Sequence, residues 1–517
     1  MFVFKRFGLS ILGIVMLLSS CQQHENKKIR STTLFVNFLE GDPPSLHPFQ
    51  LQNHIRGRAL GKLLYEGLTR IAENGTIEMA GAISYDRSPS GLEYIFYLRD
   101  HKWSDGSDVT AHDYVKAWTW ALSPQSDCSS SYYFFPILNA RNVKKGETPS
   151  ESLGVIAMDS KRLKITLERP TPYFLTLLAH PLFSPVDAKE EPKKFNGPFV
   201  LNQWDFGSKI VCKKNPNFWN QEAVKLECIY ISMIQDCAAT YSLFEKGELD
   251  WIGDPLSQLP SEYVVHLEQG GLLKSKVVNR YFWVYLNLQN EKLNSSFFRH
   301  ALSLSIDRCQ VARYIFDHYQ PLTTPLPLSL TLLRDSPVYF DLERAKHLFE
   351  KELQVLDVNP CTIVLSLKYC SEVHSHKKMA EYLKEVWEKN LGIQVELIGE
   401  QWNHLFPSIQ SGDYQICGFV NSAYYNDPIE LLDEQSQEQN YTHWFSTEYE
   451  KILLQAKELI DPDKRRACLA AAEKILVEEM PFIPIANVTH LYAHHPTLKG
   501  YRLDHAGCVD FSYAYLY

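Results

Sequence analysis

The stretch that decides the fold reads CTIVLSLKYCSEVHSHKKMAEYLKEVWEKNLGIQVELI and spans residues 361–398. Its first part, 361–369, alternates apolar and polar side chains, which is typical of a β-strand with one buried face. Residues 377–390 place their apolar side chains at helical spacing, and residues 393–398 alternate again. A strand, a helix and a second strand in this order predict a parallel strand pair with the helix packed across it. This part of the chain therefore predicts an α/β lobe.

The rest of the chain also alternates between helical and strand patterns. Residues 110–113 have the spacing of a capping box and predict the start of a helix. Another helix is expected to begin at Thr447, and Asp461-Pro462 separates it from a long helix that ends at Met480. No low-complexity block, long Pro/Gly linker or repeat interrupts the pattern, so the domains are expected to be joined by short crossings.

Length and composition narrow the class of protein. A chain of 517 residues is long enough for two or three domains of roughly 100–200 residues each. The formal net charge is -9 and no basic run lies in the body of the chain, which argues against binding to nucleic acid. Aromatic residues make up 13% of the chain, with 28 Tyr and 10 Trp. Most of them are expected in cores, and some suit a ligand cleft lined by amphipathic rings.

The first residues differ from the rest and predict export. Lys5 and Arg6 precede an apolar run at 8–18 that is too short to span a bilayer, and small residues follow it. Residues 1–20 therefore have the pattern of a signal peptide. The sequence Leu-Ser-Ser-Cys that ends at Cys21 resembles the bacterial lipobox, whose cysteine carries the lipid. We expect Cys21 to hold the protein to a membrane through residues 21–33, a polar and flexible tether.

Motifs for catalysis or metal binding are absent from the sequence. There is no GxSxG, GxxxxGK[ST], HExxH or GxGxxG pattern, and the 11 cysteines form no CxxC pair. The two histidine pairs, at 374/376 and 494/495, lack further ligands at suitable spacing for a metal. We therefore expect neither an enzyme nor a cofactor or metal site. An oxidising envelope would permit disulfides, which the sequence does not pair.

A series of short motifs runs through the body of the chain in a recognisable order. The motifs lie at 40–48, 64–68, 94–99, 103–115, 196–199, 214–219, 247–250, 285–287, 299–308, 391–393 and 424–428. Each is weak alone, but their order across roughly residues 34 to 500 resembles the oligopeptide-binding proteins of the bacterial extracellular solute-binding family 5. The resemblance therefore covers nearly the whole body of the chain.

The resemblance implies an α/β, two-lobed periplasmic-binding-protein fold of type II. Residues 34–280 and 490–517 would form the first lobe, which carries an extra subdomain, and residues 281–489 would form the second. A ligand cleft lies between such lobes, and a hinge motion closes it. The implied function is that of the solute-binding component of an ABC-type importer. It captures oligopeptides and hands them to a membrane permease, as a monomer in the periplasm or cell envelope.

The resemblance also implies where the ligand binds. Tyr132 and Tyr133 match the position of a ligand-facing tyrosine. The run 281–287 alternates, so that Tyr281, Trp283, Tyr285 and Asn287 share one face, as in the family's ligand-contacting strand. The candidate ligand-binding residues are Tyr132, Tyr133, Trp283, Tyr285, Asn421, Ser422, Ala423, Tyr424 and Tyr425, with Gln52 to His54 and Trp444 as weaker candidates.

The loop at 420–428 departs from the family pattern. Relatives place there an aspartate that meets the ligand's terminal ammonium, and this chain has Tyr424 instead. Asn421 stands at the position of a tryptophan, and Gly418 at that of an arginine. A tyrosine accepts a hydrogen bond but does not neutralise an ammonium group.

Two interpretations of this departure stay open. The ligand is still a peptide, anchored by its backbone or by another acid such as Glu40, Asp427 or Glu430. Alternatively the ligand lacks a free amine, as a blocked or cell-wall-derived peptide, haem or a metal chelate would. A secreted hydrolase is the remaining alternative, because catalytic residues need not be close in sequence.

Overall fold

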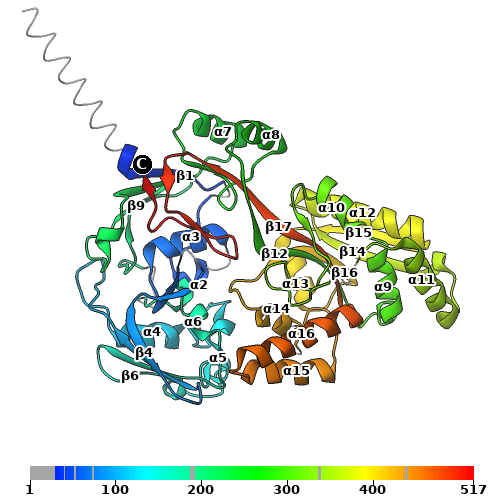
Figure 1. The fold of residues 1–517 in the computed structure, drawn as a ribbon, viewed down its shortest axis with the longest axis horizontal. Helices are drawn as coiled ribbons and strands as arrows, with labels where there is room; N and C mark the ends of the chain where they lie inside the picture. Colours follow the sequence, from blue (N-terminus) through cyan, green and yellow to red (C-terminus); the bar gives the residue numbers. More distant parts are fainter. Residues whose placement is uncertain are drawn as a thin grey trace, which may run out of the picture.

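The structure of the protein is a computed structural model that describes residues 30–39, 41–51, 54–72, 75–186, 192–335, 339–436 and 440–517. The predicted signal peptide and Cys21 lie outside these residues, as do the candidates Glu40, Gln52 and Asn53. No helix within the described ranges has both the length and the apolar character that a membrane crossing requires. Figure 1 shows two lobes side by side, connected by long strands between them.

The first lobe is built on a four-stranded sheet. Its order is β1 (Thr33–Asn37), β10 (Cys228–Ser232), β9 (Lys209–Lys214) and β8 (Phe199–Asp205). β1 and β10 are parallel and the other pairs are antiparallel. The helices of this part are α2 (Pro48–Leu51), α3 (Ile55–Leu64), α6 (Phe174–Leu177), α7 (Cys237–Glu245) and α8 (Ser261–Gln269). Short strand pairs complete it, namely β2 (Thr69–Ile71) with β3 (Ile77–Met79), β18 (Leu498–Lys499) with β21 (Tyr515–Leu516), and β19 (Arg502–Leu503) with β20 (Val509–Asp510).

The extra subdomain of the first lobe is a separate antiparallel sheet. Its order is β4 (Ala82–Arg87), β5 (Glu93–Leu98), β7 (Arg162–Thr166) and β6 (Val155–Ala157). The helical segments beside it are α4 (Ala111–Ala121), η1 (Ser131–Phe134) and α5 (Ala140–Lys145). The predicted capping box is confirmed, because the Thr110 amide donates to Asp113 Oδ2 over 2.8 Å at the start of α4.

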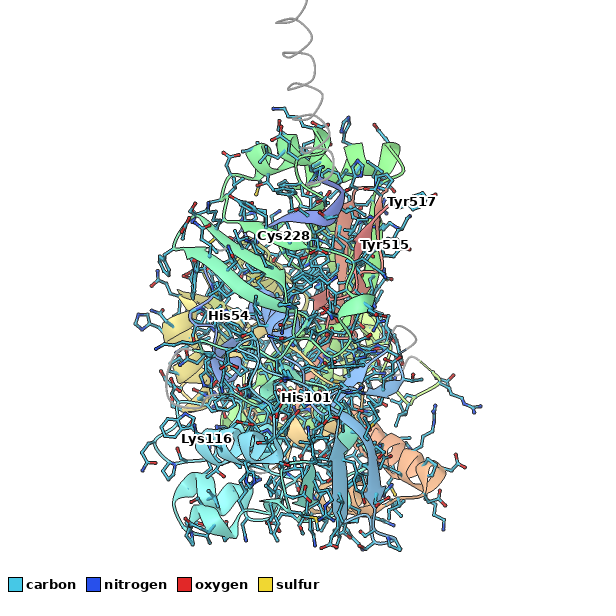
Figure 2. The ribbon with its side chains drawn as sticks, turned by 90° about the vertical axis from the view of Figure 1, so that its left-hand side faces the viewer. His54, His101, Lys116, Cys228, Tyr515 and Tyr517 are labelled. Atoms are coloured by element: carbon cyan, nitrogen blue, oxygen red, sulfur yellow. The ribbon has the colours of Figure 1, made fainter. Side chains whose placement is uncertain are left out.

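The two ends of the described chain lie at the opposite end of the first lobe from α4. Figure 2 views this lobe from its outer side, with Tyr515 and Tyr517 in the upper part and Lys116 of α4 in the lower part. Residues 30–33, assigned to the tether from the sequence, are attached to this upper part. Arg30 forms an ion pair with Asp250 at 2.9 Å, and Thr33 is the first residue of β1.

The second lobe contains the strand–helix–strand unit expected from the sequence. β14 (Val364–Cys370) and β15 (Gln394–Glu400) are parallel, and α12 (His374–Leu391) connects them. The sheet continues from β14 through β16 (Ile416–Ser422) to β12 (Lys274–Leu286). The surrounding helices are α9 (Ser296–Leu304), α10 (Arg308–Tyr314), α11 (Leu342–Leu356), α13 (Trp402–Gln410), α14 (Ile429–Glu434), α15 (Thr447–Glu458) and α16 (Pro462–Glu479). The last two begin and end as predicted, with Met480 in a left-handed conformation after α16.

The long strands β12 and β17 (Phe482–His494) pair with each other along both lobes, as Figure 1 shows. The first-lobe end of β17 pairs with β11 (Trp251–Gly253), and its second-lobe part also pairs with the short β13 (Gln320–Pro321). The β12–β17 register shifts between the pairs Val277/Thr489 and Tyr281/Asn487. Two extra residues on β12 therefore interrupt the ladder where the chain passes between the lobes.

Hydrogen bonds from the Asn487 side chain and from a neighbouring segment satisfy the backbone carbonyls at this interruption. The fully buried Asn487 donates from Nδ2 to the carbonyls of Val278 and Arg280, at 2.6 and 2.9 Å. The carbonyl of Asn279 accepts a hydrogen bond from the Ala423 amide at 2.7 Å. The crossing is therefore held by neutral hydrogen bonds that satisfy the backbone groups released by the shift.

The alternation predicted for β12 is confirmed by its packing. Phe282, Val284 and Leu286 belong to the core beneath α9 and α12. The opposite face of the strand carries Tyr281, Trp283 and Tyr285, which pack with residues from α13 to α16. The odd-numbered face of β12 is thus turned toward α14.

Candidate functional site

Residues from both lobes meet at a cluster of tyrosines. Tyr133 in η1 of the first lobe donates its hydroxyl to Glu430 Oε1 of the second lobe over 3.2 Å. Its ring lies edge-on to Tyr424 and Tyr425, with centroids 5.9 and 6.3 Å apart. Tyr173 of the first lobe stacks on Tyr425 at 5.2 Å with only 9° between the rings. At this cluster the lobes are thus in contact through aromatic rings and through the hydrogen bond from Tyr133 to Glu430.

The second-lobe side of the cluster is a loop whose shape is fixed by Glu430. This residue lies in the first turn of α14, and its two carboxyl oxygens accept the amides of Tyr424 and Tyr425, each at 2.9 Å. A carboxylate that accepts hydrogen bonds from successive amides holds the backbone in one conformation. The position of Tyr424 and Tyr425 therefore depends on Glu430.

Asp427, another acid predicted as an alternative anchor, already has a cationic partner. Arg465 of α16 donates to both of its carboxyl oxygens, at 2.9 and 2.8 Å. A bidentate pair of this kind matches the charge of the aspartate within the second lobe. The negative charge of Asp427 is therefore already balanced by Arg465 and does not serve a cationic group of a ligand.

A second carboxyl group on α14, which no motif in the sequence marks, faces the same region. Glu434 accepts the hydroxyls of Tyr281 and Tyr285 at 3.1 and 2.9 Å, and Asn421 Nδ2 lies 3.3 and 3.4 Å from its two oxygens. Glu430 and Glu434 are four residues apart, so they share one face of the helix. That spacing, opposite an alternating run of tyrosines, is the sequence signal that could have revealed the pair.

Burial raises the pKa of both glutamates. The pKa of Glu430 is raised to about 8, with the charge of Glu434 as an added cause, and that of Glu434 to about 7. Their hydrogen-bond partners are phenols, an amide side chain and backbone amides, all of them neutral. Within the described ranges, no lysine, arginine or histidine forms an ion pair with either carboxyl group.

These raised pKa values predict that stability falls as the pH rises from about 5 to 8. In this range the unfolded chain ionises its glutamates while the folded protein retains their protons, so the folded state binds more protons and loses stability with increasing pH. Glu434→Gln removes one such group, and we expect it to reduce the loss by about 3 kcal/mol. Urea unfolding of the wild type and the variant at pH 5 and pH 8 measures the difference. Equal losses in both proteins would contradict the burial of an ionisable Glu434.

Some of the other predicted ligand-binding residues lie at the tyrosine cluster, and others are buried in the interior of the protein. Tyr132 is 38% exposed and its ring lies 4.3 Å from that of Tyr133. Ser422 accepts a hydrogen bond from Arg280 at 3.2 Å, and Ala423 is fully buried beside the strand crossing. The structure therefore brings Tyr132, Tyr133, Tyr285, Asn421, Tyr424 and Tyr425 into one region.

Trp283 lies elsewhere, inside the second lobe. It is fully buried and stacks on Phe482 at 3.9 Å, so in this conformation it packs against protein. Of the weaker candidates, Trp444 is nearly buried and packs edge-on against Tyr449 at 5.0 Å, whereas His54 is exposed.

A cavity of about 100 Å³ lies on the first-lobe side of the tyrosine cluster and reaches Tyr133, Tyr424 and Tyr425. This volume suits several water molecules. Four charged residues of its wall form ion pairs with one another, Lys62 with Asp504 at 2.6 Å and Arg70 with Glu66 at 3.8 Å. The buried Arg58 guanidinium lies 4.5 Å over the Tyr424 ring. A cation therefore covers Tyr424, the residue that the family resemblance predicts to replace an aspartate.

Comparison with known proteins gives a consistent result. The profile of the bacterial extracellular solute-binding proteins, family 5 middle region, matches residues 76–443. The oligopeptide-binding protein OppA of Bacillus subtilis is 32% identical, with 99% of each chain covered. The periplasmic murein peptide-binding protein MppA of Escherichia coli is 26% identical over 98% of each chain. Among solved structures, the oligopeptide-binding protein OppAIV of Borrelia burgdorferi superposes with a TM-score of 0.79 at 26% identity. That superposition covers 94% of this chain and 100% of the other.

Proposed function

Because the chain belongs to the bacterial extracellular solute-binding proteins of family 5, we propose that it captures oligopeptides between its two lobes and delivers them to the permease of an ABC-type importer. The observation that carries this proposal is the contact of Tyr133 in the first lobe with Tyr424, Tyr425 and Glu430 in the second. A ligand bound there would touch both lobes and favour their closed arrangement.

The chemistry of the cluster suits a peptide. Aromatic rings cover apolar parts of a ligand, while their hydroxyls and the neighbouring amides offer hydrogen bonds to its backbone. The β12–β17 ladder is interrupted at residues 278–280, where Asn487 holds the strand through its side chain, and we propose that the lobes bend at this point. The relatives are named as binding proteins, and we propose that this chain likewise binds its ligand without changing it.

A modified or cell-wall-derived peptide is a second candidate ligand. It is favoured by Tyr424, whose ring is covered by Arg58 where relatives have an acid that meets an amine. Arg58 would attract an acidic group rather than an ammonium group. One relative is itself named as a murein peptide-binding protein. Mass spectrometry of molecules that co-purify with the protein separates the two candidates, because ordinary free peptides and wall peptides differ in mass and composition.

The place of the protein in the cell follows from the same proposal. A solute-binding protein has to meet its ligand outside the cytoplasm and stay near its permease. We propose that Cys21 carries the lipid that anchors a monomer to a membrane facing the cell envelope. The first described residue, Arg30, is held to the first lobe by its ion pair with Asp250, so an anchor before it would tether the protein through that lobe.

Calorimetric titration with short peptides tests the proposed function. The purified exported protein is first stripped of bound ligand by unfolding and refolding, and is then titrated with mixed peptides of two to six residues. We expect saturable binding in the micromolar range or tighter. The proposal fails if peptides of every length give no heat of binding and no peptide co-purifies with the protein.

A further inference from the structure

Among the acids in and next to α14, Glu430 and Glu434 form no ion pair with any residue that the structure describes. Asp427 is paired with Arg465, and Asp433 forms an ion pair with Lys457. Glu430 is satisfied by two backbone amides and Tyr133. For Glu434, in contrast, all the partners that the described part of the chain provides are neutral side chains.

The surroundings of Glu434 hold its carboxyl group in one position. Two phenol hydroxyls from β12 and the amide of Asn421 from β16 converge on it, and both tyrosines are fully buried. A carboxylate has about four lone-pair positions, and only the two phenol hydrogen bonds are short. The other two positions hold only the long hydrogen bonds from Asn421 Nδ2, at 3.3 and 3.4 Å, which a charged donor from a ligand would replace with shorter ones. Figure 1 shows α14 on the side of the second lobe that is turned toward the first.

Three tyrosines lie near this carboxyl group. The rings of Tyr281 and Tyr285 lie beside it, and the Tyr441 ring stands edge-on to Tyr285 at 5.9 Å. The pKa of Tyr441 is raised to about 12, mainly by burial and further by the charge of Glu434. A carboxylate removed from water is costly unless an opposite charge approaches it. The site therefore has the chemistry to hold a positive group.

We propose that Glu434 accepts the cationic group of the ligand, an ammonium or guanidinium group, in place of the loop carboxylate that Tyr424 replaces. The inference rests on the proposed function and adds a specificity-determining residue to it. A peptide offers such a cation at its amino terminus or on a lysine or arginine side chain. Both sources share the same chemistry, so the experiment has to separate them.

Calorimetric titration of matched peptides into wild type and Glu434→Gln tests the proposal. The peptides are tetra-alanine with a free amino terminus, its N-acetylated form, and an N-acetylated tetrapeptide with one lysine. We expect Glu434→Gln to weaken binding of at least one cationic peptide by tenfold or more. The neutral N-acetylated peptide should bind equally to both proteins. The cationic peptide that loses affinity identifies the source of the cation.

Two further variants control the experiment. Glu448→Gln makes the same change at an exposed position of α15 and should leave every affinity unchanged. Glu434→Asp keeps the charge but withdraws it by one methylene, and an intermediate loss is expected. It replaces Glu434→Gln as the test if circular dichroism shows that the Gln variant does not fold.

The outcomes distinguish the two proposals. If the wild type binds peptides and the Glu434 variants bind cationic peptides as tightly, the role of Glu434 is overturned while peptide capture stands. If the wild type binds none of the peptides, peptide capture is overturned and the role of Glu434 with it.

Discussion

Replacing Glu430 with alanine is expected to weaken ligand binding about 100-fold. The carboxyl group accepts the amides of Tyr424 and Tyr425, and its loss leaves both without these partners at a cost of about 1–3 kcal/mol for each one that stays buried. The loop must then adopt another shape, and the hydrogen bond from Tyr133 across the lobes disappears as well. A loss of about 3 kcal/mol corresponds to roughly a hundredfold change in Kd. Calorimetric titration with a peptide that binds the wild type measures it.

A more conservative substitution of Glu430 separates the effect of the loop conformation on binding from the effect of the charge. Glu430→Gln keeps one acceptor oxygen for the loop and removes the ionisable group, so a loss of about tenfold is expected. Glu448→Ala, at an exposed position in the same lobe, should have no effect. Wild-type affinity in Glu430→Ala would show that the conformation of the Tyr424–Tyr425 loop does not matter for binding.

Trp283→Ala is expected to destabilise the protein by about 4 kcal/mol. The side chain is fully buried, with its ring 3.9 Å from that of Phe482 and 4.2 Å from that of Tyr281. Truncation of a buried tryptophan removes this packing and leaves a cavity. Urea unfolding monitored by circular dichroism measures the loss, and Trp283→Phe should recover more than half of it.

The same variant decides between packing and ligand contact. A tryptophan that contacts ligand would lose affinity on truncation and leave stability nearly unchanged. A change in stability below 1 kcal/mol, together with lost binding, would therefore contradict the buried position of Trp283 and restore the role expected from the sequence.

The fold could be predicted from sequence where local patterns determine it. The alternation at 361–369 and 393–398 and the helical spacing between them specify β14, α12 and β15, because one buried face per element is enough to define each one. The capping pattern at 110–113 fixes the start of α4 for a similar reason. The two-lobed arrangement came from the resemblance to a family, since no local pattern states how distant elements pack.

The site could be predicted only in part. Alternation correctly placed Tyr281, Trp283 and Tyr285 on one face of β12, but it does not tell what covers that face. The structure shows that α14 brings Glu434 to Tyr281 and Tyr285, while Phe482 covers Trp283. Likewise, the loop motif located Tyr424 without showing that Arg58 from α3 lies over its ring. These contacts join segments far apart in the chain, and sequence spacing carries no information about them.

The passage of β12 and β17 between the lobes also constrains how the chain folds. The strand β11 of the first lobe cannot pair until β17 arrives, because its partners are the last residues of that strand, with Trp251 opposite His494. Until then β11 lacks its β17 partner, and an unpaired strand edge is prone to associate with other chains. Contacts between such distant residues form slowly, so this lobe should be among the last parts to become native. Completion of this lobe is therefore deferred until the C-terminal part of the chain has been made, which would suit the export proposed for the protein.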